Sequence, residues 1–217
     1  MQVISCPTRA ADPGTNLGLM VLCDGPEGCA AVDVSSGALV RGRYSAPAGS
    51  ALAPFDLVRA VIAEDPDCPD PTQPEAVALA GPPERVGRLR RRQVRRLVAP
   101  LLLPAGEQPF GFPGSAAQYW TVPGDRPSLA VLAPQRPALV RDRGEGDVVC
   151  RFGWAGVEVE LPVADQPVRR AAGPRSVLTG GDLEQLLGFA PTLLVLALSD
   201  PQDGRCYKVV VGFLPRP

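Results

Sequence analysis

The residues that could do chemistry in this chain are mainly arginines, because histidine is absent and lysine occurs once, at Lys208. Without an imidazole, neither a serine–histidine nor a cysteine–histidine nucleophile can form, and zinc loses its commonest ligand. Lys208 lies in the strand-like stretch CYKVVVGFL, without the glycine-rich loop that a phosphate site needs. The sequence therefore favours a protein that is not an enzyme, and it predicts neither a cofactor nor a metal site.

Seven arginines cluster between Arg85 and Arg96, with no acid among them. A helix that opens at Pro82–Pro83 would put apolar side chains on one side and all these arginines except Arg90 on the other. Such a face is either simply solvated or built to bind an anion or a partner. The residues expected to bind are Arg88, Arg91, Arg92 and Arg95; the expected apolar side is Val86, Leu89, Val94, Leu97, Val98 and Leu101.

Neighbouring like charges on one helix face repel one another by about 0.2–0.5 kcal/mol per pair, so we expect something to offset them. One candidate is internal, an acidic stretch that precedes the arginines in the sequence. The other is external, either an acidic protein or a polyanion such as nucleic acid. The internal acids are Glu64, Asp65, Asp67, Asp70 and Glu75.

The overall charge bears on the choice between these partners. The formal net charge is −1 and the isoelectric point is near 5.6, so the chain lacks the basic field of most nucleic-acid binders. Lys208 is the only basic residue that is not arginine, a usage typical of a high-GC bacterium, so the choice of arginine itself says little about phosphate recognition. We therefore expect a protein partner, or a second copy of the chain, rather than nucleic acid.

An aromatic loop forms the second candidate site. Residues 104–127 are rich in proline and glycine, which predicts a loop or linker. These rings either fold back onto the core or form a recognition loop that binds a partner. The rings are Phe110, Phe112, Tyr119 and Trp120.

The six cysteines show no C-x-x-C pair, which argues against a zinc ribbon or an iron–sulfur cluster. The stretch LGLMVLCDGPEGCAAVDV predicts a hairpin whose turn lies near Asp24–Gly28 and whose strands place Cys23 opposite Cys29. These two thiols are expected either to pack together or to have a redox or metal role. The other cysteines are Cys6, Cys68, Cys150 and Cys206.

The hydrophobic patterns predict an α+β, strand-rich fold. Residues 17–23, 29–35 and 38–44 read as strands, 53–65 as a helix, 75–81 as a strand and 82–101 as the arginine helix. A mainly antiparallel β part follows, with hairpins at 147–163 and 190–214 and one short helix at 178–188. The expected organisation is an α/β part over 1–103, a loop or linker over 104–127 and a β part over 128–217, or else one continuous domain.

The strand–strand–strand–helix–strand–helix order resembles that of RNase H-like and actin-like folds, and LCDGPEGCAAVDVSSGALVRG resembles their first hairpin. By this resemblance, Asp24 would match the first-strand acid that helps to hold a divalent metal in the nucleases. The chain departs from the pattern where a second acid is required, since the fourth strand ends in ALAGPP. The resemblance implies, as an alternative function, a divergent or degenerate metal-dependent phosphodiester enzyme.

The sequence predicts neither export nor insertion into a membrane. The start MQVISCPTRAADPG lacks the basic and apolar regions of a signal peptide, and the apolar run APTLLVLAL is shorter than the roughly 20 residues that cross a bilayer. The sequence therefore predicts a cytoplasmic interaction or regulatory protein with no membrane contact.

Overall fold

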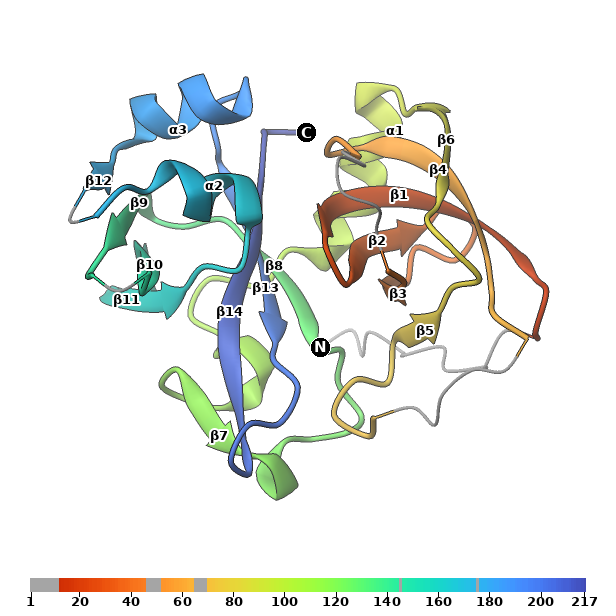
Figure 1. Cartoon of the computed structure of the whole chain (residues 1–217), viewed down its shortest axis with the longest axis horizontal. Helices are drawn as coiled ribbons and strands as arrows, with labels where there is room; N and C mark the ends of the chain where they lie inside the picture. The colour runs from red at the N-terminus through yellow and green to blue at the C-terminus, as the bar shows by residue number, and fades with distance from the viewer. Residues whose placement is uncertain (1–11, 46–51, 65–69, 145, 175) are drawn as a thin grey trace. The chain divides into compact units, whose positions relative to one another are not determined.

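The computed structural model describes residues 12–45, 52–64, 70–144, 146–174 and 176–217. The chain forms two compact units (Figure 1). Unit 1 comprises Met1–Pro100 with Pro123–Leu129, and unit 2 comprises Leu101–Val122 with Ala130–Pro217. Strands dominate both units, which confirms the strand-rich α+β class. Residues of the predicted linker 104–127 belong to both units. The expected division at residues 103 and 128 therefore remains a prediction.

Unit 1 is built on one six-stranded sheet in the order β5-β3-β2-β1-β4-β6. The three-strand meander expected at its start is confirmed, with each strand antiparallel to the next. The elements are β1 (Asn16–Gly25), β2 (Gly28–Asp33), β3 (Leu39–Arg43), β4 (Asp56–Val61), β5 (Ala76–Ala78), β6 (Glu84–Arg88) and the helix α1 (Arg91–Val98).

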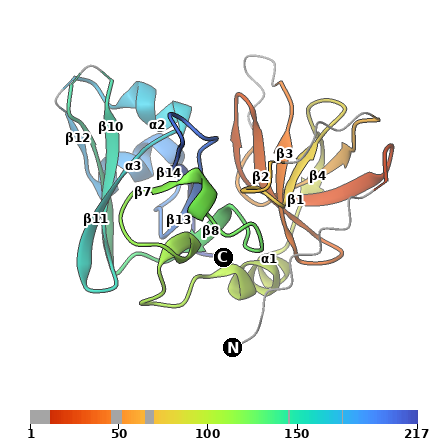
Figure 2. The ribbon, with the colours of Figure 1, turned by 90° about the horizontal axis from the view of Figure 1, so that it is seen from below.

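The pairing of the unit 1 strands closes five of them into a small barrel, in which β1 to β4 can be followed in Figure 2. β5 runs parallel to β3, and the residues just after it pair with the end of β4, where Ile62 bridges Leu79 and the Ala80 N–H donates to the Val61 carbonyl at 2.8 Å. The ring order is therefore β1-β2-β3-β5-β4, a Greek-key barrel. Its interior is apolar and holds Leu19, Val21, Cys29, Ala31, Val40, Tyr44, Val58, Ala60 and Leu79.

The helix predicted over 53–65 is wrong, since these residues form β4. Apolar residues at 57, 58, 61 and 62 fit a helical face, but the observed burial alternates instead: Val58 and Ala60 point inward, whereas Arg59 and Val61 are exposed. β-Branched side chains favour a strand that can pair on both edges, as β4 does with β1 and β6. The order on which the RNase H-like resemblance rested is therefore not present.

The predicted arginine helix is right only in its second half. Residues 84–88 form β6, and α1 begins at Arg91 with Arg90 as its N-cap. Pairing with β4 outweighs helix propensity in the first half, which leaves Val86 47% exposed rather than on an apolar stripe. Val94, Val98 and Leu101 are buried as expected.

The hairpin at Asp24–Gly28 is confirmed, but its predicted register is wrong by one residue. Asp24 pairs with Cys29, and Cys23 pairs with Ala30 beyond a bulge between Val21 and Cys23. A one-residue slip moves a side chain to the other face of a sheet. Cys29 therefore lies in the barrel interior, while Cys23 lies on the opposite face, so the two thiols do not pack together.

Unit 2 contains two four-stranded sheets, β11-β10-β9-β12 and β7-β14-β13-β8. Its elements are β7 (Ala116–Gln118), β8 (Leu129–Leu132, of which Leu129 belongs to unit 1), β9 (Arg136–Asp142), β10 (Val148–Trp154), β11 (Val157–Pro162), α2 (Gln166–Ala171), β12 (Val177–Leu178), α3 (Gly180–Leu187), β13 (Leu193–Leu198) and β14 (Arg205–Leu214), with short 3₁₀ turns at Pro109–Gly111 and Tyr119–Thr121.

Several predictions for this half are confirmed. β10 and β11 form the hairpin around Ala155, and β13 and β14 form the closing hairpin. α3 has Thr179 as its N-cap and ends at Gly188, whose φ of 75° suits glycine. The inward strand face is confirmed at Leu161, whereas Val157 at the start of β11 is exposed. α2 is a second short helix that the sequence pattern did not predict.

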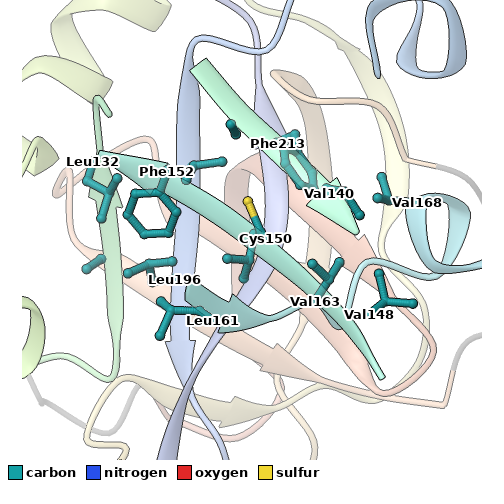
Figure 3. Close-up of a cluster of buried hydrophobic side chains, with 14 of the residues drawn as sticks. Leu132, Val140, Val148, Cys150, Phe152, Leu161, Val163, Val168, Leu196 and Phe213 are labelled. Atoms are coloured by element: carbon teal, nitrogen blue, oxygen red, sulfur yellow. The ribbon is translucent and has the colours of Figure 1, made fainter. Parts of the chain in front are cut away.

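The core of unit 2 lies between its sheets and helices. Strands distant in sequence contribute to it, with Cys150 and Phe152 from β10 beside Leu196 from β13 and Phe213 from β14 (Figure 3). Burial raises the pKa of the Cys150 thiol to about 12, so this cysteine is a packing residue rather than a nucleophile. Within the described residues, every helix is too short or too polar to cross a membrane.

Candidate functional site: an arginine surface

The arginines between Arg85 and Arg96 gather on β6 and on α1, which follows β6 in the chain (Figure 1). All seven are exposed, and we call them the arginine surface. Arg88 ends β6, whereas Arg91, Arg92 and Arg95 are exposed on α1, whose buried residues are Val94 and Val98. The four arginines predicted as a binding site are thus exposed in one short segment, although Arg88 is on a strand rather than on the helix.

One arginine of this surface is fixed from inside the fold. The Arg85 Nε lies 3.0 Å from Oδ2 of Asp56, a carboxylate that is only 2% exposed. The same Asp56 oxygen accepts a hydrogen bond from the Ala53 N–H at 3.1 Å. Arg88 in turn donates to the Pro54 carbonyl oxygen at 3.4 Å. β6 is therefore attached to β4 by side chains as well as by its backbone ladder.

The positive charges at the start of α1 have fewer acidic neighbours than Arg85 has. The first turn of α1 contains no acid but begins with Arg91 and Arg92, at the end of the helix where the backbone dipole is positive. Arg91 and Arg92 also lie four residues before Arg95 and Arg96, so like charges face each other along the helix. Among the described residues, no salt bridge reaches Arg91, Arg92 or Arg96. An anionic group is the natural complement of this surface.

Two of the five acids expected to neutralise the arginines have other partners. The Glu75 carboxylate is buried and accepts hydrogen bonds from the Ser128 hydroxyl and from the Ser128 N–H. Asp70 accepts from the Thr72 hydroxyl and N–H, each at 2.8 Å. Glu64 is exposed, and Asp65 and Asp67 lie outside the described residues.

The outer face of β2 and β3 is engaged by the chain itself. Here Arg41 donates to the Ser128 hydroxyl at 3.4 Å, and Arg43 donates to the Gln73 side chain at 2.6 Å. Segment Pro123–Leu129 lies so close to loop 70–75 that a Cβ at Gly124 would meet the Pro71 carbonyl oxygen at 2.7 Å. The arginines of this face therefore serve internal contacts, unlike those of the arginine surface.

The predicted aromatic loop is mostly core. Phe110 is buried in unit 2, with a positive φ of 60° that the surrounding packing holds. Phe112 and Tyr119 are partly buried against the same core. Trp120 alone of the four is exposed, at 70%, on the short 3₁₀ turn beside Gly204. The structure thus reduces the proposed recognition loop to one indole ring.

Lys208 is a buried residue that the sequence pattern did not single out as structural. It is 3% exposed, and its Nζ donates to the Phe112 carbonyl oxygen at 2.6 Å and lies 4.2 Å from the centre of the Phe112 ring. Burial lowers the pKa of its ammonium group to about 8. Its being the one lysine of the chain, on an apolar strand, was the only signal for this role.

Asp24 has partners that differ from those of a metal ligand. Its carboxylate accepts hydrogen bonds from the Tyr44 hydroxyl, the Gly25 N–H and the Leu52 N–H. Burial, and then the hydrogen bond to Asp24, raises the pKa of Tyr44. In the part of the chain that the structure describes, no three cysteine, aspartate or glutamate residues come together as a metal site would require. The geometry thus gives Asp24 a structural role at the end of the hairpin.

A hollow of about 300 Å³ in unit 2 is also lined by polar and charged residues, namely Gln166, Asp142, Arg169 and Arg170. Two of them are already bonded to the loop between β9 and β10. The Asp142 carboxylate accepts from the Gly144 N–H at 2.6 Å, and Arg169 donates to the Gly146 carbonyl at 3.3 Å. These contacts give Asp142 and Arg169 a structural role.

Comparison with known proteins adds no relative. No protein-family model matches the sequence, and no curated protein is significantly similar to it. The functional argument therefore rests on the arginine surface.

Proposed function

We propose that this protein is a non-enzymatic cytoplasmic binding protein whose arginine surface holds an acidic segment of a protein partner. The observation that carries the proposal is the pair Arg91 and Arg92 at the positive end of α1, exposed and with no acid in that turn. The net charge of −1 supplies no long-range attraction for nucleic acid, so a short local contact with carboxylates fits the chain better. Trp120 offers a second, separate contact.

Binding of poly-glutamate at low and high salt tests this proposal. Replacing Arg91, Arg92 and Arg96 by Gln should weaken binding about ten-fold, because each exposed charge pair contributes a few tenths to about 1 kcal/mol. The melting temperature should stay unchanged or rise, since the substitutions relieve repulsion within α1. The matched control replaces the exposed Arg126, Arg205 and Arg216 by Gln, which removes the same charge elsewhere.

Three outcomes would reject the proposal. Failure of the wild-type protein to bind poly-glutamate at low salt removes its basis. Tighter binding of duplex DNA, with a log–log salt slope that flattens by about 0.9 per arginine lost, would favour the nucleic-acid alternative instead. Equal weakening by the control substitutions would show that net charge, rather than this surface, attracts the ligand.

A further inference from the structure

β6 lies at the edge of its sheet. It pairs with β4 on one side, and among the described residues no strand pairs with its other side. Four of its five residues are exposed, including Val86 at 47%. An open edge of this kind presents unpaired N–H and C=O groups on which a further strand can form.

The ladder to β4 shows which backbone groups face outward. Asp56 is paired with Arg88, and the next residue, Leu89, donates its N–H to the Phe55 carbonyl at 3.4 Å. In an antiparallel ladder, the backbone groups of successive residues point alternately toward and away from the neighbouring strand. The N–H and C=O of Arg88 therefore point away from β4, toward the open edge.

Charge restricts which strand this edge can accept. A second copy of β6 in a parallel register would bring each arginine against its own copy, and like charges on an edge strand are a common protection against self-association. An acidic strand would instead place carboxylates beside Arg85 and Arg88, and alternate apolar residues could contact Val86. The edge therefore fits an acidic segment.

We propose that the acidic partner binds in an extended conformation and adds a strand along the open edge of β6. This inference rests on the proposed function, because it states how the arginine surface holds its acidic partner. Backbone hydrogen bonds would supply affinity, and the arginines would supply the preference for acidic sequence.

A matched pair of variants separates strand addition from simple charge attraction. Arg88→Gln and Arg88→Pro both remove the guanidinium, but only proline also removes the outward N–H. Proline is tolerated on edge strands when that N–H faces away from the sheet. With a peptide of alternating glutamate and valine, we expect the proline variant to bind about 3- to 10-fold more weakly than the glutamine variant, since one backbone hydrogen bond is lost.

A second probe makes the test independent of how the proline variant folds. The same peptide with N-methyl groups on all of its amides keeps its charge but cannot donate ladder bonds from either edge. We expect the wild-type protein to bind the methylated peptide about ten-fold or more weakly. Equal affinity for the two peptides would overturn strand addition while leaving the arginine surface intact as a binding site. Absence of binding to either peptide and to poly-glutamate would refute the proposed function itself.

Discussion

The Nζ of Lys208 donates to the carbonyl oxygen of Phe112 at 2.6 Å and lies 4.2 Å from the centre of the same residue's ring. This pair attaches β14 to the loop that carries Phe110 and Phe112 in unit 2. No carboxylate takes part in the contacts described for this ammonium group, so burial without an opposite charge lowers its pKa to about 8. Burial of Lys208 therefore costs less free energy when the side chain is a neutral amine than when it is an ammonium ion.

Stability should rise with pH where this lysine titrates. In the unfolded chain the ammonium stays protonated to about pH 10.5, whereas in the folded protein it loses its proton near pH 8. Between these values the unfolded state binds more protons, so the free energy of unfolding increases with pH, by at most about 3 kcal/mol. Urea unfolding of the wild type and of Lys208→Met from pH 7 to pH 10 measures this contribution of Lys208 to the free energy of unfolding.

The variant serves as the reference because other groups titrate in the same range. Unfolded thiols ionise above about pH 8.5 and lower the stability of both proteins equally. The difference in unfolding free energy, wild type minus Lys208→Met, should therefore rise between pH 8 and pH 10. A constant difference over that range would show that Lys208 is not desolvated in the folded protein.

The observed register of the first hairpin places Cys23 and Cys29 on opposite faces of the sheet, so their thiols should differ in reactivity. Cys29 is buried in the barrel, where burial and then the charge of Asp24 raise its pKa to about 12. Cys23 is half-buried on the other face of the sheet. At pH 8 we expect iodoacetamide to modify Cys23 at least about a hundred-fold faster than Cys29, because the thiolate is the reactive form. Mass spectrometry of the digested protein gives both rates.

Mild oxidation checks the same geometry in a different way. Side chains on opposite faces of a sheet cannot approach to the Cβ separation of about 4 Å that a disulfide needs. The native protein should therefore yield no peptide that joins Cys23 to Cys29, whereas the protein oxidised in denaturant can form one. Recovery of that cross-linked peptide from the folded protein would contradict the observed register and support the predicted pairing of Cys23 with Cys29.

These examples show where sequence patterns were sufficient and where they failed. The hairpin at Asp24–Gly28 and the cap of α3 at Thr179 depend on local signals, turn residues and a short polar side chain, and both were predicted correctly. The prediction for residues 53–65 was wrong because the apolar residues of β4 fit helical and strand periodicity equally well. Only pairing with β1 and β6, which are distant in the sequence, decides between them.

Some features of the candidate sites could likewise be predicted from local sequence patterns, whereas others depend on contacts between distant residues. Exposure of Arg91, Arg92 and Arg95 follows from the amphipathic pattern of residues 91–98, which is local information. The ion pair of Arg85 with the buried Asp56 and the open edge beside Arg88 follow from β6 pairing with β4, which no periodicity in residues 84–88 reveals. Four aromatic rings in one loop could not be sorted by sequence, because burial there depends on the sheets of unit 2.

Trp120 should behave as a surface residue in every test of stability. Its ring is 70% exposed, whereas Trp154 is buried and donates its indole N–H to the Glu107 carbonyl at 2.9 Å. In the Trp154→Phe variant, iodide should readily quench the remaining fluorescence of Trp120. Trp120→Ala should change the free energy of unfolding by less than about 1 kcal/mol, as exposed substitutions usually do.

Phe110→Ala is the matched comparison, because it truncates a buried ring of the same loop and should cost about 3–5 kcal/mol. If Trp120→Ala proves as costly as Phe110→Ala, or if iodide fails to reach Trp120, the ring belongs to the core and the loop has no exposed aromatic contact to offer. If the two substitutions differ as expected, the exposure of Trp120 serves no purpose in folding, since hydrophobic surface of that size adds nothing to stability while it stays in water. A ring held on the surface by a rigid turn is then available for contact with a partner, independently of the arginine surface.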